Sequence, residues 1–194
     1  MKKLSVGFIF AVISTLSYGQ FKQGTIMVGG SFSATFNTEK TKNGNTTTTT
    51  GHTNSIDMLP QGGYFLIDNV AVGTGVDMSS SKYKTTDGLY TSSSNSVSLA
   101  PFARYYYEKF YGQASFQVGH GTTRILNDGS TSNSSYSISG WSLAGGYAWL
   151  LNESVAVEPQ LGYASLGEKY SGTNKDYSSG LFFRIGFQIY LFKK

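Results

Sequence analysis

The final segment of the chain, Leu181–Phe192 with the sequence LFFRIGFQIYLF, decides the fold. Every second residue in it is large and apolar: Leu181, Phe183, Ile185, Phe187, Ile189 and Leu191. Arg184, Gly186 and Gln188 lie between them. A period of two places the two sets on opposite faces of a β-strand. The segment is about twice as long as an average globular strand, so it predicts a long strand with one wholly apolar face.

The same alternation recurs along the chain and predicts seven further strands. In each segment the apolar residues fall on one parity. The predicted spans are 24–36, 53–66, 69–81, 91–107, 110–121, 135–150, 154–166 and 178–192. The sixth span is the least regular, because Tyr136 and Ile138 are out of phase with Trp141. A β-bulge would explain that shift.

The connections between these strands alternate in length. The short ones carry turn-forming pairs such as Asp68-Asn69, Glu108-Lys109 and Asn152-Glu153. The long ones are rich in Ser, Thr, Gly and Asn, and they cover residues 37–52, 82–90, 122–134 and 167–177. Strict alternation of short and long connections predicts an all-β, antiparallel, up-and-down sheet of eight strands.

Charge is scarce, at 13% of the chain, and its distribution follows the predicted faces. The predicted strands contain five charged residues, all on the face opposite the apolar one: Asp57, Asp77, Arg104, Glu158 and Arg184. That face is too polar for a dry core, because each buried charge needs a partner. A soluble antiparallel sheet would wet its polar face and bury the apolar one.

The reverse arrangement resolves the conflict. If lipid contacts the apolar face, the sheet must close into a barrel, since lipid offers the backbone no hydrogen-bond partners. The predicted strands reach the length needed to span a bilayer, about 9–11 tilted residues. We therefore predict an eight-stranded transmembrane β-barrel with short periplasmic turns and long extracellular loops. Tyr64, Tyr107, Phe110 and Trp149 lie beside the short turns and are predicted to form an aromatic girdle.

The N-terminus has the layout of a secretory signal peptide. Lys2 and Lys3 precede an apolar stretch, and small residues lead to a predicted cleavage between Gly19 and Gln20. Residues 1–19 are thus assigned to the signal peptide and 20–194 to the barrel domain. The chain has no Cys, which excludes disulfides and thiolate metal sites. We predict no cofactor and no metal site. We also predict no nucleic-acid binding, because the net charge of +4 is small and the body of the chain contains no basic cluster.

These features together resemble the small outer-membrane β-barrels of the OmpA/OmpX type. The hairpins with the sequences PQGGYF and RYY resemble those of the outer membrane protein beta-barrel domain proteins of Bacteroidota. The resemblance implies a Gram-negative outer-membrane location, and outer-membrane lipids, lipopolysaccharide and the barrel assembly machinery as partners. Arg184, Gly186, Ile189 and Leu191 resemble the terminal signal that this machinery reads.

The five charged strand residues would meet inside so narrow a barrel. We favour a salt-bridged plug over a gate for small solutes, because buried charges usually pair. The predicted role of this monomer is structural or surface-exposed, in envelope integrity, adhesion or defence, without catalysis. The alternatives are a small-solute or hydrophobic-compound channel, a lipid A-modifying enzyme using His120, and a secreted barrel with an apolar ligand. Pro60, Pro101 and Pro159 fall inside predicted strands, where bulges would relieve the first two.

Overall fold

The computed structural model describes residues 21–43, 46–170 and 175–191, nearly all of them in β-strands. The predicted signal peptide, with Gly19 and Gln20, lies outside the described residues. The strands are β1 (Ile26–Asn43), β2 (Thr46–Ile67), β3 (Val70–Thr85), β4 (Tyr90–Tyr107), β5 (Phe110–Asn127), β6 (Ser130–Tyr147), β7 (Trp149–Leu150), β8 (Val155–Tyr170) and β9 (Lys175–Leu191). Among the described residues, no helix is long and apolar enough to cross a membrane.

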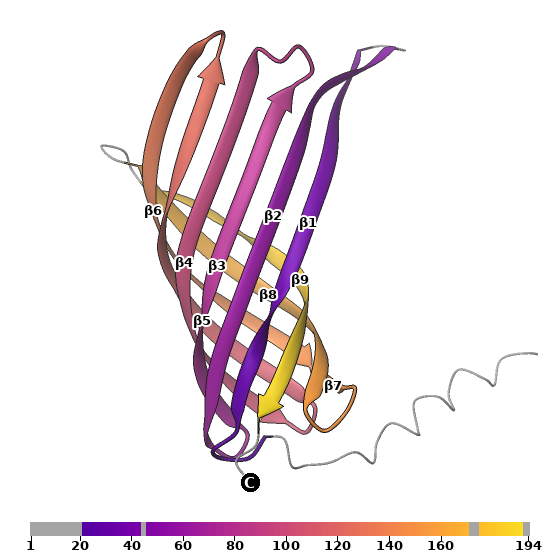
Figure 1. The fold of residues 1–194 in the computed structure, drawn as a ribbon, viewed down its shortest axis with the longest axis vertical. Helices are drawn as coiled ribbons and strands as arrows, with labels where there is room; N and C mark the ends of the chain where they lie inside the picture. The colour runs from indigo at the N-terminus through magenta and orange to yellow at the C-terminus, as the bar shows by residue number, and fades with distance from the viewer. Residues whose placement is uncertain (1–20, 44–45, 171–174, 192–194) are drawn as a thin grey trace, which may run out of the picture.

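The strands form a closed ring of antiparallel neighbours (Figure 1). Strands β1 to β6 each pair with the next, β6 and the short β7 both pair with β8, β8 pairs with β9, and β9 returns to β1. The short β7 continues β6 along the same edge of β8, so the ring holds the eight strands that the sequence predicts. A path that starts at Tyr190 on β9 and steps to the paired residue on each neighbouring strand in turn goes once around the ring. It returns to β9 at Gly180, ten residues away. This stagger is what a closed, tilted barrel requires.

The strands extend further than the sequence analysis predicts. Most of the segments expected as long loops are paired strand extensions, so that β5 and β6 continue to a tight turn at Asp128-Gly129. Both turn residues have positive φ, 46° and 79°. Asp-Gly is a strong hairpin signal because both central residues of that turn need positive φ. The segments rich in Ser and Thr, which were expected as loops, therefore form regular hairpins for most of their length.

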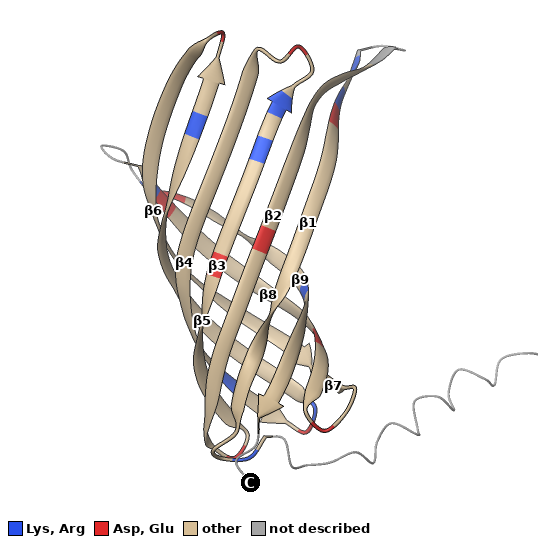
Figure 2. Ribbon diagram, viewed as in Figure 1, with Lys and Arg blue, Asp and Glu red and all other residues tan. Residues whose placement is uncertain are grey.

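The outer surface has an apolar band with a polar upper part. On β3 the outward positions run from Val70 to Met78 and then change to Ser80, Lys82 and Lys84. On β5 the change comes after Val118, and Arg124 lies above it. Figure 2 shows charged residues gathered toward the two ends of the barrel, with few between. Charges outside the predicted five are thus found on strands, above the band that lipid would contact.

The three prolines interrupt the hydrogen-bonded ladder without shifting its register. The β2–β3 pairing skips Leu59 and Pro60, and the β4–β5 pairing skips Ala100 and Pro101. Both ladders resume in the same register, so the bulges predicted at Pro60 and Pro101 are wrong. Pro159 lies where β8 has no partner between β6 and β7. Because proline has no N–H to donate, a gap in the ladder accommodates it.

The sixth strand carries no bulge at Tyr136 either. Its pairing with β5 runs from Ser130 to Tyr147 in one register. Tyr136 and Ile138 are buried and face the interior, whereas Trp141 is 46% exposed on the outer face. The Tyr136 hydroxyl on β6 forms a hydrogen bond of 3.0 Å with the Ser94 hydroxyl on β4, inside the barrel. The expectation that every apolar side chain points outward was therefore wrong at this position.

Candidate functional site: a closed lumen

A buried ion pair crosses the barrel interior. Arg104 projects inward from β4 and Glu158 from β8, and Arg104 Nη1 donates to Glu158 Oε2 at 2.7 Å. Both side chains are 2% exposed. The alternation of β4 and β8 aims these two residues into the lumen, since their outward neighbours are apolar. The pair is one of two ion pairs within 4.0 Å among the described residues, the other being Lys22–Asp68 at the surface.

Two tyrosines complete the hydrogen bonding of this pair. The same Nη1 of Arg104 donates to the Tyr106 hydroxyl at 2.8 Å, and its Nε donates to Gln113 Oε1 at 2.8 Å. The Tyr190 hydroxyl donates to Glu158 Oε1 at 2.5 Å and lies 3.1 Å from the Tyr106 hydroxyl. The charges are therefore joined in one network across β4, β5, β8 and β9. A buried charge pair is tolerated when its remaining donors and acceptors are satisfied in this way.

Phe21 closes the end of the barrel that carries the short turns, below the ion pair. Its ring stacks on that of Tyr106 with centroids 4.1 Å apart, and meets Tyr190 edge-on at 5.5 Å. The Phe21 side chain is 6% exposed and belongs to an apolar cluster that includes Phe65 and Met27. We call Phe21 and the network of Arg104, Gln113, Glu158, Tyr106 and Tyr190 the lumen plug. No sequence pattern predicts the roles of Phe21, Tyr106 and Tyr190, because inward-facing aromatic residues give no period-two signal of their own.

The segment that carries Phe21 is fastened to the turn between β2 and β3. The Asn69 amide donates to the Phe21 carbonyl at 2.7 Å, and the Gln23 amide donates to Asp68 Oδ1 at 2.8 Å. Lys22 Nζ lies 3.4 Å from Asp68 Oδ2. The hydrogen bond from the Gln23 amide lowers the pKa of the Asp68 carboxyl, and the charge of Lys22 lowers it further.

The five charged lumen residues do not form a single cluster. Arg104 and Glu158 pair, whereas Asp57 accepts hydrogen bonds from the hydroxyls of Ser33 at 3.1 Å and Ser79 at 2.7 Å. Arg184 lies over the ring of Phe182, with its guanidinium carbon 5.2 Å from the centroid. Asp77 faces the lumen on β3 and is half-buried. Arg104 and Glu158 therefore lie at one level, near the short turns, and Asp57, Asp77 and Arg184 lie above them.

The predicted girdle residues lie on the outer surface near the short turns. Tyr64, Tyr107, Phe110 and Trp149 are 45%, 69%, 61% and 51% exposed. Phe110 packs against Tyr147 of the neighbouring strand, with ring centroids 5.0 Å apart. Of the predicted assembly-signal residues, Ile189 and Leu191 point outward, whereas Arg184 and Gly186 point inward.

The histidines lie on the outer face of the strand extensions. His120 is exposed on β5, and His52 Nδ1 lies 3.3 Å from the Thr38 hydroxyl. Within the part of the chain that the structure describes, no group of three or more His, Asp or Glu residues is placed to hold a metal ion.

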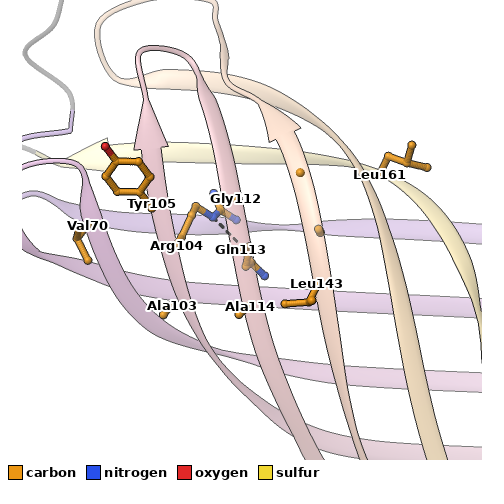
Figure 3. A pocket seen from close by; sticks show the side chains of 11 residues that line it. Val70, Ala103, Arg104, Tyr105, Gly112, Gln113, Ala114, Leu143 and Leu161 are labelled. Carbon is orange, nitrogen blue, oxygen red and sulfur yellow. Dashed lines mark hydrogen bonds between the residues drawn. The ribbon is translucent and has the colours of Figure 1, made fainter.

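A shallow hollow of about 620 Å³ lies on the wall formed by β4, β5 and β6. Small residues form its floor, including Ala103, Gly112 and Ala114, and Tyr105 and Leu143 rise at its sides (Figure 3). Gly112 has no atom within 4 Å of where a Cβ would lie. Arg104 and Gln113 of the lumen plug also line the hollow, which therefore marks a thin part of the wall beside the plug.

Comparison with known protein families agrees with this architecture. The Autotransporter beta-domain family matches residues 27–182. No curated protein matches the sequence. One similar solved structure is the translocator domain of autotransporter NalP from Neisseria meningitidis, with 14% identity and a TM-score of 0.48, covering 94% of this chain and 66% of that one. Another is the outer membrane protein OprG from Pseudomonas aeruginosa, with 16% identity and a TM-score of 0.40, covering 88% and 97%.

The chain thus spans about two thirds of the NalP domain. The family match covers most of the described barrel, from the second residue of β1 into β9. The predicted outer-membrane β-barrel is confirmed, and the described strands carry most of their predicted apolar residues on the outer surface. Because the match extends over more than half of its length, the chain belongs to the Autotransporter beta-domain family and is a β-barrel of the Gram-negative outer membrane.

Proposed function

We propose that the protein is a small, monomeric, surface-exposed barrel of the OmpA/OmpX type with a structural role and no catalysis. The lumen plug is the observation that carries this proposal. The Arg104–Glu158 pair at 2.7 Å spans the interior and Phe21 caps it from below. An eight-stranded barrel has room for little more than its own side chains. A permeation path would need this network to come apart and leave two buried charges unpaired.

The strand extensions support a role at the cell surface, in envelope integrity, adhesion or defence. They continue the sheet above the apolar band as paired hairpins, such as the one joining β5 and β6. Paired backbone groups need no further partners, so the side chains are free to contact other molecules. Asp87 lies at the tip of the β3–β4 hairpin, where the hydroxyl of Thr85 donates to it at 2.6 Å.

Lipopolysaccharide is a fitting partner for the surface just above the apolar band. Lys82 on β3 pairs in register with Ser93 on β4, and Ser93 pairs with Arg124 on β5. Lys82 and Arg124 are exposed and point outward. Two cations in one row are suited to phosphate groups, with which arginine forms bidentate hydrogen bonds. A second partner is the barrel assembly machinery. Ile189 and Leu191 of β9 belong to the predicted assembly signal, and their exposure on the outer surface makes them accessible to it.

Single-channel recording in planar bilayers tests the proposal. The purified protein should give no stable conductance steps, and Arg104→Ala and Glu158→Ala should introduce them by opening the plug. Arg124→Ala is the matched control, because it removes an arginine from the outer surface of β5 and should leave the trace silent. Steady steps from the unaltered protein would favour the small-solute channel.

Export of a polypeptide is a second candidate, since NalP is described as a translocator domain. It requires an emptied lumen, so the same recordings bear on it. The enzyme alternative needs a separate measurement. Mass spectrometry of lipid A from cells with and without the protein should give identical acyl patterns. A difference that His120→Ala abolishes would overturn the proposal in favour of lipid modification.

A further inference from the structure

The boundary between β1 and β9, here called the seam, is only partly closed. Its pairs join Ile26–Ser31 to Gly186–Leu191. By contrast, β1 pairs with β2 along its whole length to Asn43. Above the seam, the facing edges of Phe32–Asn43 and Lys175–Ile185 have no partner strand among the described residues. Figure 1 shows the upper parts of β1 and β9 separating from each other.

Part of this open edge lies at the level of lipid. Phe32 and Phe36 on β1 are 62% and 73% exposed, and Leu181 and Phe183 on β9 are 79% and 66% exposed. All four belong to the outward-facing apolar set. Lipid supplies no partners for free backbone N–H and C=O groups, so an open strand edge at this depth is strongly disfavoured. These edges therefore require a partner in the membrane.

The register makes each edge the natural partner of the other. The existing pairs oppose Val28 to Ile189 and Ser31 to Gly186. Continued without a bulge or a slip, the same register opposes Ala34 to Phe183 and then Phe36 to Leu181. Apolar outward positions then meet apolar outward positions, as the side-chain period of two requires.

Charged residues on the lumen face favour the same closure. In the continued register Arg184 stands opposite Ser33, which already pairs with Asp57. Neither Arg184 nor Asp57 has an ion pair within 4.0 Å in the described part of the chain. Strands lie about 4.8 Å apart, so closure would place Arg184 two strands from Asp57, within reach of its long side chain.

We propose that the seam is a lateral gate between the lumen and the bilayer. In its closed state β1 and β9 pair in register through Phe36 and Leu181, and an Arg184–Asp57 ion pair holds them. In its open state, which is the one described here, the lumen above Ser31 and Gly186 is continuous with lipid. The gate lies above the lumen plug and does not depend on the proposed function, because lateral opening leaves the periplasmic end sealed.

Disulfide crosslinking in native outer membranes tests the closed state, and the natural chain contributes no cysteine. The double variant Ala34→Cys/Phe183→Cys should crosslink within one chain under a membrane-permeable oxidant. Val28→Cys/Ile189→Cys is the positive control, because that pair is already formed. Ala34→Cys/Leu181→Cys, two residues out of register, should crosslink far less. Folding of each variant is checked by its faster migration when unboiled on a gel.

Three results would overturn the gate. The first is a lack of crosslinking at 34/183 when 28/189 reacts. The second is equal crosslinking at 34/181, which would mean that the closure has no fixed register. The third is a crosslink between two chains, which would assign the edge to a second copy.

The ion pair is tested on the same crosslink. Arg184→Gln and Asp57→Asn should each slow formation of the 34/183 disulfide several-fold, and the two together should slow it no further. Asp87→Asn is the control for loss of a carboxylate away from the seam, and should leave the rate unchanged. Additive effects of the first two variants would contradict an ion pair between them.

Discussion

Arg104 and Glu158 lie 54 positions apart in sequence and meet at 2.7 Å inside the barrel. They come from β4 and β8, which are not neighbours in the ring. The contact therefore crosses the lumen instead of running along its wall. One polar bridge of this kind connects two parts of the sheet that share no backbone hydrogen bond.

Glu158→Gln should destabilise the barrel by about 3–5 kcal/mol, because it leaves the Arg104 guanidinium buried without a counter-charge. The double variant Arg104→Met/Glu158→Gln should recover part of that loss, since no uncompensated charge remains. Urea unfolding in lipid vesicles, followed by gel migration, measures both. Equal stability of the single variant and the unaltered protein would mean that water reaches Arg104.

Phe21→Ala should lower the free energy of unfolding by about 3 kcal/mol, the usual loss for a buried phenylalanine. The centroid of its ring lies 4.1 Å from that of Tyr106 and 6.0 Å from that of Phe65, and it stacks on both rings. Leu89→Ala is the control, because that side chain is 56% exposed at the tip of the β3–β4 hairpin, above the apolar band. The same unfolding measurement applies. A larger loss for the control than for Phe21→Ala would contradict the cap.

Acid should loosen the segment that holds Phe21. The pKa of Asp68 is lowered in the folded protein, so its contribution is present above the ordinary carboxyl pKa of about 4 and is lost as the pH falls through the folded value. Hydrogen exchange at the Gln23 amide should therefore accelerate, relative to its intrinsic rate, in strong acid. Asp68→Asn should remove that dependence. Protection that persists unchanged at low pH in the unaltered protein would contradict this role.

Gly146 should tolerate no larger residue, because the ring of Tyr111 lies where its Cβ would be. Gly146→Val is expected to cost about 1–3 kcal/mol through overpacking. The matched control is Gly112→Val on the adjacent strand, where no atom lies within 4 Å of the Cβ position. Urea unfolding should leave this control close to the unaltered protein. Similar losses at both sites would indicate a general cost of replacing strand glycines instead of a clash.

Period-two patterning was sufficient to predict the ring of eight strands and the inward orientation of Arg104 and Glu158. It was not sufficient to pair them, because alternation gives the face of a residue and not its height in the barrel. Asp57 and Arg184 illustrate this difference. They share the predicted face with Arg104, yet Asp57 bonds to serines and Arg184 lies over an aromatic ring.

The wrong prediction at Tyr136 and the lack of one at Pro159 have physical causes. Tyr136 was assigned by hydrophobicity alone, although its hydroxyl can bond within a polar interior, as it does with Ser94. The placement of Pro159 cannot be predicted from the sequence, because the break between β6 and β7 has no sequence signal of its own. The gap is visible only when the pairing of β8 with both strands is known.

The upper hairpins hold their tips at a nearly fixed distance from the membrane. A strand rises about 3.3 Å per residue, so the six residues from Ser80 to Thr85 set a nearly fixed height for the β3–β4 tip. A floppy loop of the same composition would sample many heights and lose entropy on meeting another molecule. A phage or antibody that approached this tip would find Asp87 and Leu89 presented on a rigid support, at a constant distance from the membrane.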